Sequence, residues 1–366
     1  MQNPRSLTAD HFSDVLRRLP GSLDLDVLAR ETGAIQRKRE VIDGSSLLRL
    51  ALARGPGGLS LRETSCWASL SGTAELSNPG VHYRLKQAAP FFEALVEHLL
   101  LDKVPGADLR WPDRRLCLAD GTCISKPGSK GTDWRVHGVF DLGRGGFSHL
   151  ELTDYHGGEG LDRGTAQPGE IWIGDRNYAR TKILKRFVAE SAGKADFIVR
   201  IGWNALQLRT TSDEAFDLIE YLQSLPVDLD SHEKALHAVA SRDAGALPVR
   251  LIVRRKTPEA TEATRLALRR NAAKKGKKLD PRSLIAAEFM ILGTSLPAKG
   301  YAAADIMVVY RLRWQIELAF KRLKSLLHID RMPTRTEQAS RTWIYAHLIL
   351  ALLCDDLSQD FLDSSP

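Results

Sequence analysis

The stretch YRLRWQIELAFKRLK, residues 310–324, sets four chemically active side chains at intervals that a helix would align. A helix turns by roughly 100° per residue, so these side chains fall within a sector of about 60°. They are Tyr310, Arg313, Glu317 and Lys324. Leu312, Ile316 and Ala319 form a separate apolar stripe, which predicts an amphipathic helix packed on a core. Taken alone, the pattern also fits a solvated helix face with an Arg–Glu pair at i,i+4.

The size and composition of the chain indicate a globular protein. Its 366 residues exceed one typical domain, so we expect two or three domains. It is 43% hydrophobic and 27% charged, and its longest apolar stretch, residues 343–354, is too short to span a bilayer. The start of the sequence lacks the apolar run of a signal peptide. The four cysteines show neither CxxC nor zinc spacing, and this usage predicts a protein of the reducing cytoplasm. The net charge of +7 is compatible with a polyanionic partner without requiring one.

Residues 1–110 show the periodicity of helices. The sequence SLRE follows a Gly-rich break, and its Ser60 and Glu63 predict a capping box at a helix start. Asn78 and Pro79 predict the cap and first turn of the next helix, which we expect to run without interruption to about residue 100.

Two helices joined by a short turn predict a helix-turn-helix within residues 60–100. The start of its second helix carries four residues that we expect to meet DNA. These residues are His82, Tyr83, Arg84 and Lys86. An ordinary helical hairpin fits the same stretch equally well.

From Trp111 the hydrophobic period changes from helical to strand-like. Strands are expected in residues 114–124, 132–142, 146–155, 170–174, 195–208, 247–256 and 288–295. A helix is expected in residues 181–193, and a basic helix and loop in residues 264–281. This order of elements predicts an α/β fold.

Two apolar runs each end in an aspartate, at Asp120 within LADGT and at Asp175 within IGDRN. A carboxylate at the end of a buried strand is costly to desolvate unless a positive charge lies near. Each aspartate could be a turn residue that caps its strand. Together with Glu317, the two predict a three-carboxylate site, whose oxygen ligands suit Mg²⁺. No cluster of His or Cys in the sequence offers a competing zinc site.

The four polar residues of the stretch 310–324 match, with unchanged spacing, the Y-R-E-K signature of a large group of bacterial insertion-sequence transposases. The DGT around Asp120 and the GDRNY around Asp175 resemble the contexts of that family's two catalytic aspartates. The order Asp, Asp, long insertion and Glu is similar too, and the resemblance covers nearly the whole chain. The chain thus resembles the DDE transposases of the insertion-sequence-four-like family.

The resemblance implies an α/β fold with a ribonuclease-H-like catalytic core, in which helices flank a mixed sheet. The core would be interrupted by a β-rich insertion before the final acidic helix, and preceded by an all-helical DNA-binding domain. The implied parts are a DNA-binding domain at 1–110, a catalytic domain at 111–200 and 301–355, an insertion domain with a basic segment at 201–300, and a C-terminal tail at 356–366.

The resemblance also implies the chemistry. Asp120, Asp175 and Glu317 would be catalytic and would ligate two Mg²⁺ ions, for which Mn²⁺ would substitute. One ion would activate water and later a DNA 3′-hydroxyl, while the other would stabilise the departing oxygen. The result would be cut-and-paste transposition, in which the transposon ends are cleaved and joined to target DNA.

Further residues would contact DNA. Those expected to grip phosphates at the transposon end are Tyr310, Arg313 and Lys324. From the residues alone, Arg313 could equally orient Glu317. Arg176 would lie beside the DNA strand, and Trp203 would stack on a flipped base, although a core tryptophan fits the sequence as well.

The partners implied are double-stranded DNA, as terminal inverted repeats and target, and further copies of the chain in a homodimer or larger assembly. No membrane is involved, and the implied location is the bacterial cytoplasm at the nucleoid.

Three other functions can be compared with the residues present. An aspartyl-phosphate phosphatase would need a nucleophilic carboxylate at Leu118, and a leucine cannot attack phosphorus. A catalytically silent DNA-binding regulator or domesticated relative would need no acidic trio. An endonuclease of the same fold would cut without joining, and a strand-transfer assay with a 3′-hydroxyl donor separates it from a transposase.

Overall fold

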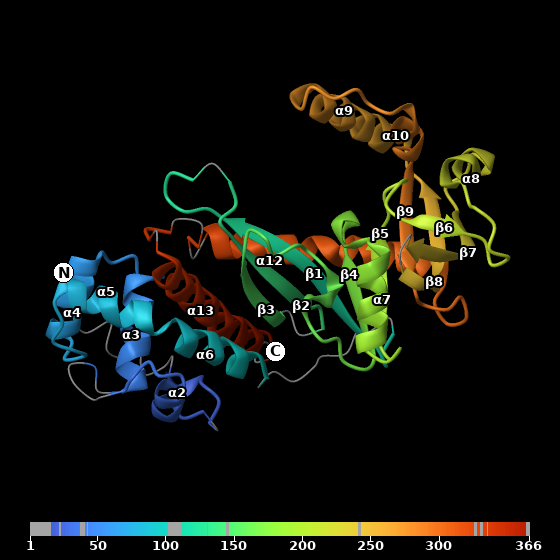
Figure 1. The fold of residues 1–366 in the computed structure, drawn as a ribbon. Helices are drawn as coiled ribbons and strands as arrows, with labels where there is room; N and C mark the ends of the chain where they lie inside the picture. Colours follow the sequence, from blue (N-terminus) through green and yellow to red (C-terminus); the bar gives the residue numbers. More distant parts are fainter. Residues whose placement is uncertain are drawn as a thin grey trace. The chain divides into compact units, whose positions relative to one another are not determined.

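The computed structural model describes residues 16–21, 23–36, 41, 43–101, 111–129, 131–143, 146–240, 243–325, 328–329, 332–334 and 336–363 (Figure 1). The chain forms two compact units, and each is assembled from separate segments. The first comprises Met1–Gly106, Gly121–Gly157 and Leu318–Pro366, and the second comprises Ala107–Asp120 and Gly158–Glu317. The expected domain boundaries at 110, 200, 300 and 355 stay a prediction.

The protein has a mixed α/β fold with a large mixed sheet, as the sequence predicted. The nine strands follow the order β3-β2-β1-β4-β5-β9-β8-β7-β6. The second unit contains β4 to β9 and the start of β1 (Arg115–Ile124), whereas the end of β1 belongs to the first unit.

Helices make up the described part of the chain before β1. They are α2 (Leu25–Glu31), α3 (Gly44–Arg54), α4 (Leu61–Leu70), α5 (Asn78–Gln87) and α6 (Ala89–Leu101). The expected capping box opens α4: the Ser60 hydroxyl accepts from the Glu63 N–H at 3.2 Å, and the Glu63 carboxylate accepts from the Ser60 N–H at 2.7 Å. This reciprocal pair satisfies two backbone donors that a helix start leaves unbonded.

The single helix expected from residue 78 to about 100 is wrong, because the structure divides it at Ala88. Pro90 has no backbone N–H to bond to the preceding turn, and its ring disfavours helical geometry in the residue before it. The N-cap of α5 is Ser77, whose hydroxyl accepts from the Gly80 N–H at 3.3 Å, so Asn78 is the first helical residue and not the cap.

The helix α13 (Glu337–Asp363) packs on the helices of the first unit. The buried Thr342 hydroxyl donates to the Leu85 carbonyl at 2.7 Å, and the Tyr345 hydroxyl donates to the Glu93 carboxylate at 2.6 Å. These bonds fix α13 against α5 and α6. The helix extends into the segment 356–366 that was expected to be a tail.

In the first unit, β2 (Trp134–Asp141) and β3 (Gly146–Asp154) form an antiparallel pair. The helix α12 (Trp314–Ser325) approaches this pair at Gly138, where a glycine leaves room for two aromatic rings. Phe147 and Phe320 are in ring contact, with centroids 5.4 Å apart.

The second unit is built on parallel strands extended by antiparallel ones. Its remaining strands are β4 (Glu170–Gly174), β5 (Asp196–Arg200), β6 (Gln207–Arg209), β7 (Ser231–Ala240), β8 (Asp243–Arg255) and β9 (Phe289–Thr294). β1, β4 and β5 pair in parallel, and β9, β8, β7 and β6 continue the sheet antiparallel. The strand expected over 195–208 is instead two strands, β5 and β6, separated by a turn that includes Gly202 and Trp203.

Helices and short 3₁₀ turns complete the second unit. They are η1 (Leu161–Arg163), η2 (Arg176–Tyr178), α7 (Thr181–Glu190), α8 (Leu218–Ser224), α9 (Pro258–Lys274), α10 (Pro281–Ala286), α11 (Ala303–Tyr310) and η3 (Arg311–Arg313). α7 and the basic helix α9 were expected at these places. In the described part of the chain, no helix has the length and apolarity needed to cross a membrane.

We predict that Gly138→Ala destabilises the protein. A Cβ at this position would lie 2.8 Å from Phe320 and 2.9 Å from Phe147, so the rings must shift. Overpacking of this kind costs about 1–3 kcal/mol. Urea unfolding followed by circular dichroism measures the change. Gly131→Ala is the matched control, since a Cβ there meets nothing within 4 Å, and equal stability of both variants would contradict the packing described.

Candidate functional site

Asp120 lies inside strand β1 and not at its end, contrary to the sequence prediction. β1 continues through Gly121 and Thr122 to Ile124, so these residues extend the strand although they resemble a turn in the sequence. Asp120 is half-buried, and Leu118 and Ala119 before it are buried. The carboxylate therefore lies at a point where a fully apolar strand becomes partly accessible to solvent.

Asp175 directly follows β4, as predicted. Its backbone is still extended, with φ −77° and ψ −173°, and its carboxylate accepts from the Asn177 N–H at 2.7 Å to cap the turn η2. The capping role foreseen as an alternative is therefore present. Only one oxygen is used in this bond, so capping and a functional role are compatible.

The parallel strands bring Asp120 and Asp175 to the same level of the sheet. In β1 and β4, Leu118 pairs with Ile173, and continuing this register by two residues sets Asp120 opposite Asp175. Neighbouring strands lie about 4.8 Å apart, and paired residues of parallel strands face the same side. Two carboxylates 55 positions apart in the sequence thus become neighbours.

The same register adds a residue that the sequence reasoning missed. In β4 and β5, Gly174 pairs with Val199, so the next position sets Asp175 level with Arg200. The sequence shows Arg200 only as the end of the apolar run FIVR, and its relation to Asp175 needs the strand order.

The stretch 310–324 is not one continuous α-helix. α11 ends at Tyr310, the turn η3 covers Arg311–Arg313, and α12 starts at Trp314. In a 3₁₀ turn, side chains three residues apart eclipse each other, so the turn brings Arg313 in line with Tyr310. Further along, Ile316 and Ala319 are buried, as the apolar stripe predicted.

Arg313 is the cation of this segment that interacts with the candidate carboxylates. Its guanidinium donates to the Glu317 carboxylate at 2.5 Å, across one turn of helix. Burial opposes the charged form of Arg313, but the bond to Glu317 and the charges of Glu317, Tyr310 and Asp120 raise its pKa. A single cation thus interacts with Asp120 from β1 and with Glu317 from α12.

Tyr310 links this cation to the second aspartate. Burial raises the pKa of its phenol, the positive charges of Arg313 and Arg200 lower it, and the charge of Asp175 raises it. Tyr310 is 7% exposed, so these charges act through a largely desolvated environment. Through Tyr310 and Arg313, all three candidate carboxylates belong to one electrostatic neighbourhood.

The donor set fits a divalent cation in its chemistry. Carboxylate oxygens are the ligands that Mg²⁺ prefers, and Arg313 supplies positive charge to two of the three carboxylates. Among the described residues, however, no three side chains of His, Cys, Asp or Glu are spaced to hold a metal ion. The Glu317 carboxylate instead accepts a hydrogen bond from Arg313, which agrees with the alternative that Arg313 orients Glu317.

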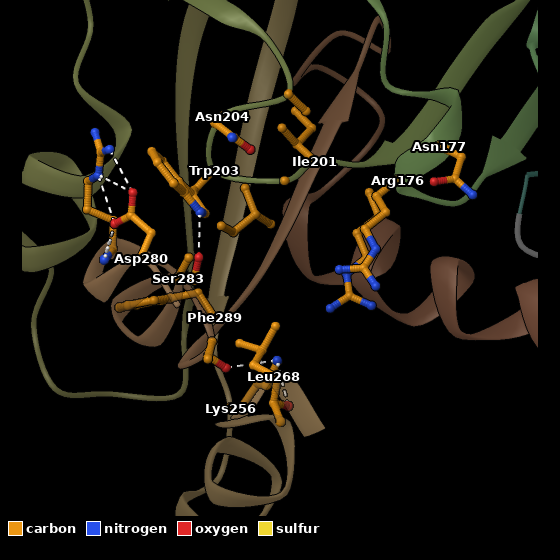
Figure 2. Close-up of a pocket in the computed structure, with 18 residues that line it drawn as sticks. Arg176, Asn177, Ile201, Trp203, Asn204, Lys256, Leu268, Asp280, Ser283 and Phe289 are labelled. Atoms are coloured by element: carbon orange, nitrogen blue, oxygen red, sulfur yellow. Dashed lines mark hydrogen bonds and ion pairs between the residues drawn. The ribbon is translucent and has the colours of Figure 1, made fainter. Parts of the chain in front are cut away.

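Trp203 and Arg176 line a cavity next to these residues in the second unit (Figure 2). The Trp203 indole donates to the Ser283 hydroxyl at 3.1 Å and is half-buried, so it is neither a core residue nor freely exposed. Arg176, which follows Asp175, is exposed. Lys324 is half-buried on α12.

The residues expected to meet DNA in α5 point in different directions. Tyr83 is 60% exposed, and with Arg84 it lines a cavity of about 510 Å³ that also includes Ser77. His82 instead lines a cavity of about 200 Å³ with residues of α13, such as Trp343. Lys86, like His82 and Arg84, is half-buried.

Comparison with known proteins places these observations in a family. Residues 111–353 match the family model described as "Transposase DDE domain". The transposase for insertion sequence element IS421 of Escherichia coli is 38% identical over 98% of this chain and 96% of its own length. The transposase for IS231F of Bacillus thuringiensis subsp. israelensis is 24% identical over 94% of this chain and 79% of its own.

Among solved structures, the piggyBac transposase synaptic complex with hairpin DNA aligns with a TM-score of 0.42 and 8% identity. The alignment covers 98% of this chain and 68% of that one. The chain belongs to the family of insertion-sequence transposases that carry a DDE domain.

Proposed function

We propose that this transposase cleaves DNA at transposon ends and joins them to target DNA with Asp120, Asp175 and Glu317 as its catalytic carboxylates. The observation that carries the proposal is the parallel register that sets Asp120 level with Asp175, with Arg313 in electrostatic contact with both Asp120 and Glu317. The fold would then be the ribonuclease-H-like one that the family resemblance implies.

The three carboxylates would hold two divalent metal ions, Mg²⁺ or in its place Mn²⁺. When bound, the ions supply Lewis-acid stabilisation of the attacking and leaving oxygens of a phosphodiester. The extended backbone at Asp175 and the strand at Asp120 fix two carboxylates on a rigid sheet. Glu317, on a helix and 54% exposed in its side chain, is the carboxylate with freedom to adjust.

Arg313 has two competing anionic partners in this proposal. Its pair with Glu317 is partly exposed, and such pairs contribute only about 0.2–1 kcal/mol. A DNA phosphate offers the guanidinium two acceptor oxygens in a bidentate geometry. Arg313 would therefore leave Glu317 when DNA binds, which frees the carboxylate for metal and places the guanidinium on the phosphate.

The remaining residues would bind and orient DNA. The Tyr310 hydroxyl and the Lys324 ammonium would donate to phosphates of the transposon end. Arg176 would lie beside the strand, and Trp203 would stack on an unpaired base. Tyr83 is the most exposed of the four candidate residues in α5, which supports a contact with duplex DNA there.

The partners in this proposal are the terminal inverted repeats, the target duplex and further copies of this chain. Two ends must be joined to one target, so a homodimer or larger assembly would pair them. The named relatives are bacterial, and the reaction needs chromosomal DNA, which supports a cytoplasmic location at the nucleoid.

We predict that Asp120→Asn, Asp175→Asn and Glu317→Gln each abolish cleavage while DNA binding is kept. Loss of one ligand removes several kcal/mol of transition-state stabilisation, a rate decrease of about a thousandfold or more. Gel analysis of cleavage on a duplex carrying the element's end measures the rate, and anisotropy measures binding. Asp162→Asn is a matched control outside the site. Retained nicking by any of the three would remove that residue from the catalytic set.

We predict that a precleaved end with a free 3′-hydroxyl is joined to target DNA in the presence of Mg²⁺ or Mn²⁺, and that EDTA stops the reaction. The 3′-hydroxyl replaces water as the nucleophile, so no further energy source is needed. Joined products on a sequencing gel report strand transfer. Cleavage without joining would identify an endonuclease, and binding with neither would identify a DNA-binding regulator.

We predict that Lys324→Ala weakens binding of the end duplex more than binding of random duplex. A lysine beside the scissile phosphate contributes one charge-assisted contact, so end affinity should fall roughly tenfold. Competition between the two duplexes in anisotropy measurements gives the ratio, and Lys321→Ala is the control on the same helix. An equal loss for both duplexes would assign Lys324 a non-specific charge role.

A further inference from the structure

The second unit contains a cavity of about 590 Å³ beside the candidate carboxylates (Figure 2). It is lined by residues from η2, the end of β5 and the turn after it, α9, α10 and β9, and by Lys256, which directly follows β8. In Figure 2 the ring of Trp203 and the side chain of Arg176 border the cavity from different sides. The cavity is therefore part of one unit, made by elements that the sequence separates by more than a hundred positions.

Positive charge dominates the lining. Its cationic side chains are Arg176, Arg200, Lys256 and Arg282, and its single carboxylate is Asp280. Arg282 takes up that carboxylate through bonds of 2.8 and 3.1 Å. In the described part of the chain, the side chains of Arg176 and Arg200 form no hydrogen bond or ion pair. Three cations therefore face the cavity without a neutralising carboxylate.

Lys256 is held in place by its neighbours. Its ammonium donates to the Ala287 carbonyl at 2.9 Å and to the Thr264 hydroxyl at 3.2 Å, which leaves one of its three N–H groups unused. Burial and, to a smaller extent, the charges of Arg200 and Arg176 together lower its pKa to about 8. Like charges held together in this way are stabilised by a bound anion.

Trp203 forms a fixed wall of the cavity. Its indole is bonded to Ser283, and the Arg282 guanidinium lies 4.3 Å from the ring centre. Because Arg282 is itself paired with Asp280, it braces the ring and does not add free charge. The cavity is thus preformed, and a ligand would meet three cations and a fixed aromatic ring.

The cavity adjoins the candidate carboxylates through Arg200. The strand register sets this residue level with Asp175, and its charge acts on the Tyr310 phenol. Arg176 follows Asp175 directly in the chain. An anion in the cavity would therefore lie next to the proposed point of cleavage.

We propose that this cavity binds a backbone phosphate of DNA through Arg200, Lys256 and Arg176. This phosphate would be adjacent to the phosphate at which the DNA is cleaved. The proposal rests on the proposed function, because it takes DNA as the polyanion. Its basis is the combination of a preformed cavity, three cations without carboxylate partners, and the position of Arg176, which lines the cavity and directly follows Asp175. Arg200 and Lys256 are accordingly assigned as phosphate-binding residues.

The test measures how DNA affinity depends on salt. Each phosphate contact releases counterions, so losing one lysine or arginine contact reduces the slope of log K against log[KCl] by about 1. The Arg200→Gln/Lys256→Met variant should lose about 2 from this slope and bind an end duplex roughly a hundredfold more weakly at fixed salt. Anisotropy of a fluorescein-labelled end duplex, measured without divalent metal, reports both quantities.

Matched variants separate phosphate binding from a structural role. Lys299→Gln removes an exposed lysine of the same unit and should leave the slope unchanged. Lys256→Arg and Arg200→Lys keep the charges and should restore most of it. If Lys256→Met lowers the unfolding temperature but the double variant keeps the wild-type slope, Lys256 only joins α9 to α10 and the proposal fails.

A second arm distinguishes DNA from a free phosphorylated molecule. Calorimetric titration with inorganic pyrophosphate should show at most weak binding by the wild-type protein. Tight binding that the double variant loses, together with an unchanged DNA slope, would overturn the assignment to DNA. Failure of the cleavage proposal is seen separately, because wild-type protein would then bind the duplex with the full slope and leave it uncut in Mg²⁺.

Discussion

The parallel register of β1, β4 and β5 is the constraint on which the candidate site depends. Side chains alternate between the two faces of a strand, so a slip of one residue would move a carboxylate to the opposite face. The register is held by fully buried pairs, such as Leu118 with Ile173. Burial of ordinary aliphatic residues thus determines that Asp120, Asp175 and Arg200 form a row across three strands.

The row brings negative charges close together, so positive charge is needed to balance them. Carboxylates on neighbouring strands repel each other, and their partial burial makes the repulsion stronger than in water. The charge of Arg313 acts on Asp120 and Glu317, and the charge of Arg200 acts on the Tyr310 phenol. Arg313 stabilises two of the carboxylates in the protein alone, and it is also a group that a DNA phosphate would attract. Site assembly and substrate binding therefore use the same charges.

The sequence was sufficient to propose the acidic residues of the candidate site but not to predict their full surroundings. Spacing and the family resemblance led to Asp120, Asp175 and Glu317, because those signals are local. They could not show that β1 runs past Asp120, since Gly121 and Thr122 resemble a turn and only pairing with neighbouring strands keeps them extended. Contacts between distant segments, such as those of the cavity, depend on strand order and were likewise invisible.

Arg313 has a carboxylate partner, whereas Arg200 and Lys256 have none among the described residues, and this difference separates their roles. Arg313 already has a carboxylate partner, so its transfer to DNA exchanges one ion pair for another and releases Glu317. Arg200 and Lys256 have no such partner among the described residues, so an anion bound there gains attraction without breaking a pair. DNA would then engage the cavity before it displaces Arg313. Arg200 and Lys256 would thus fix the strand first, and Glu317, one of the proposed catalytic carboxylates, would be released only when a phosphate has reached Arg313.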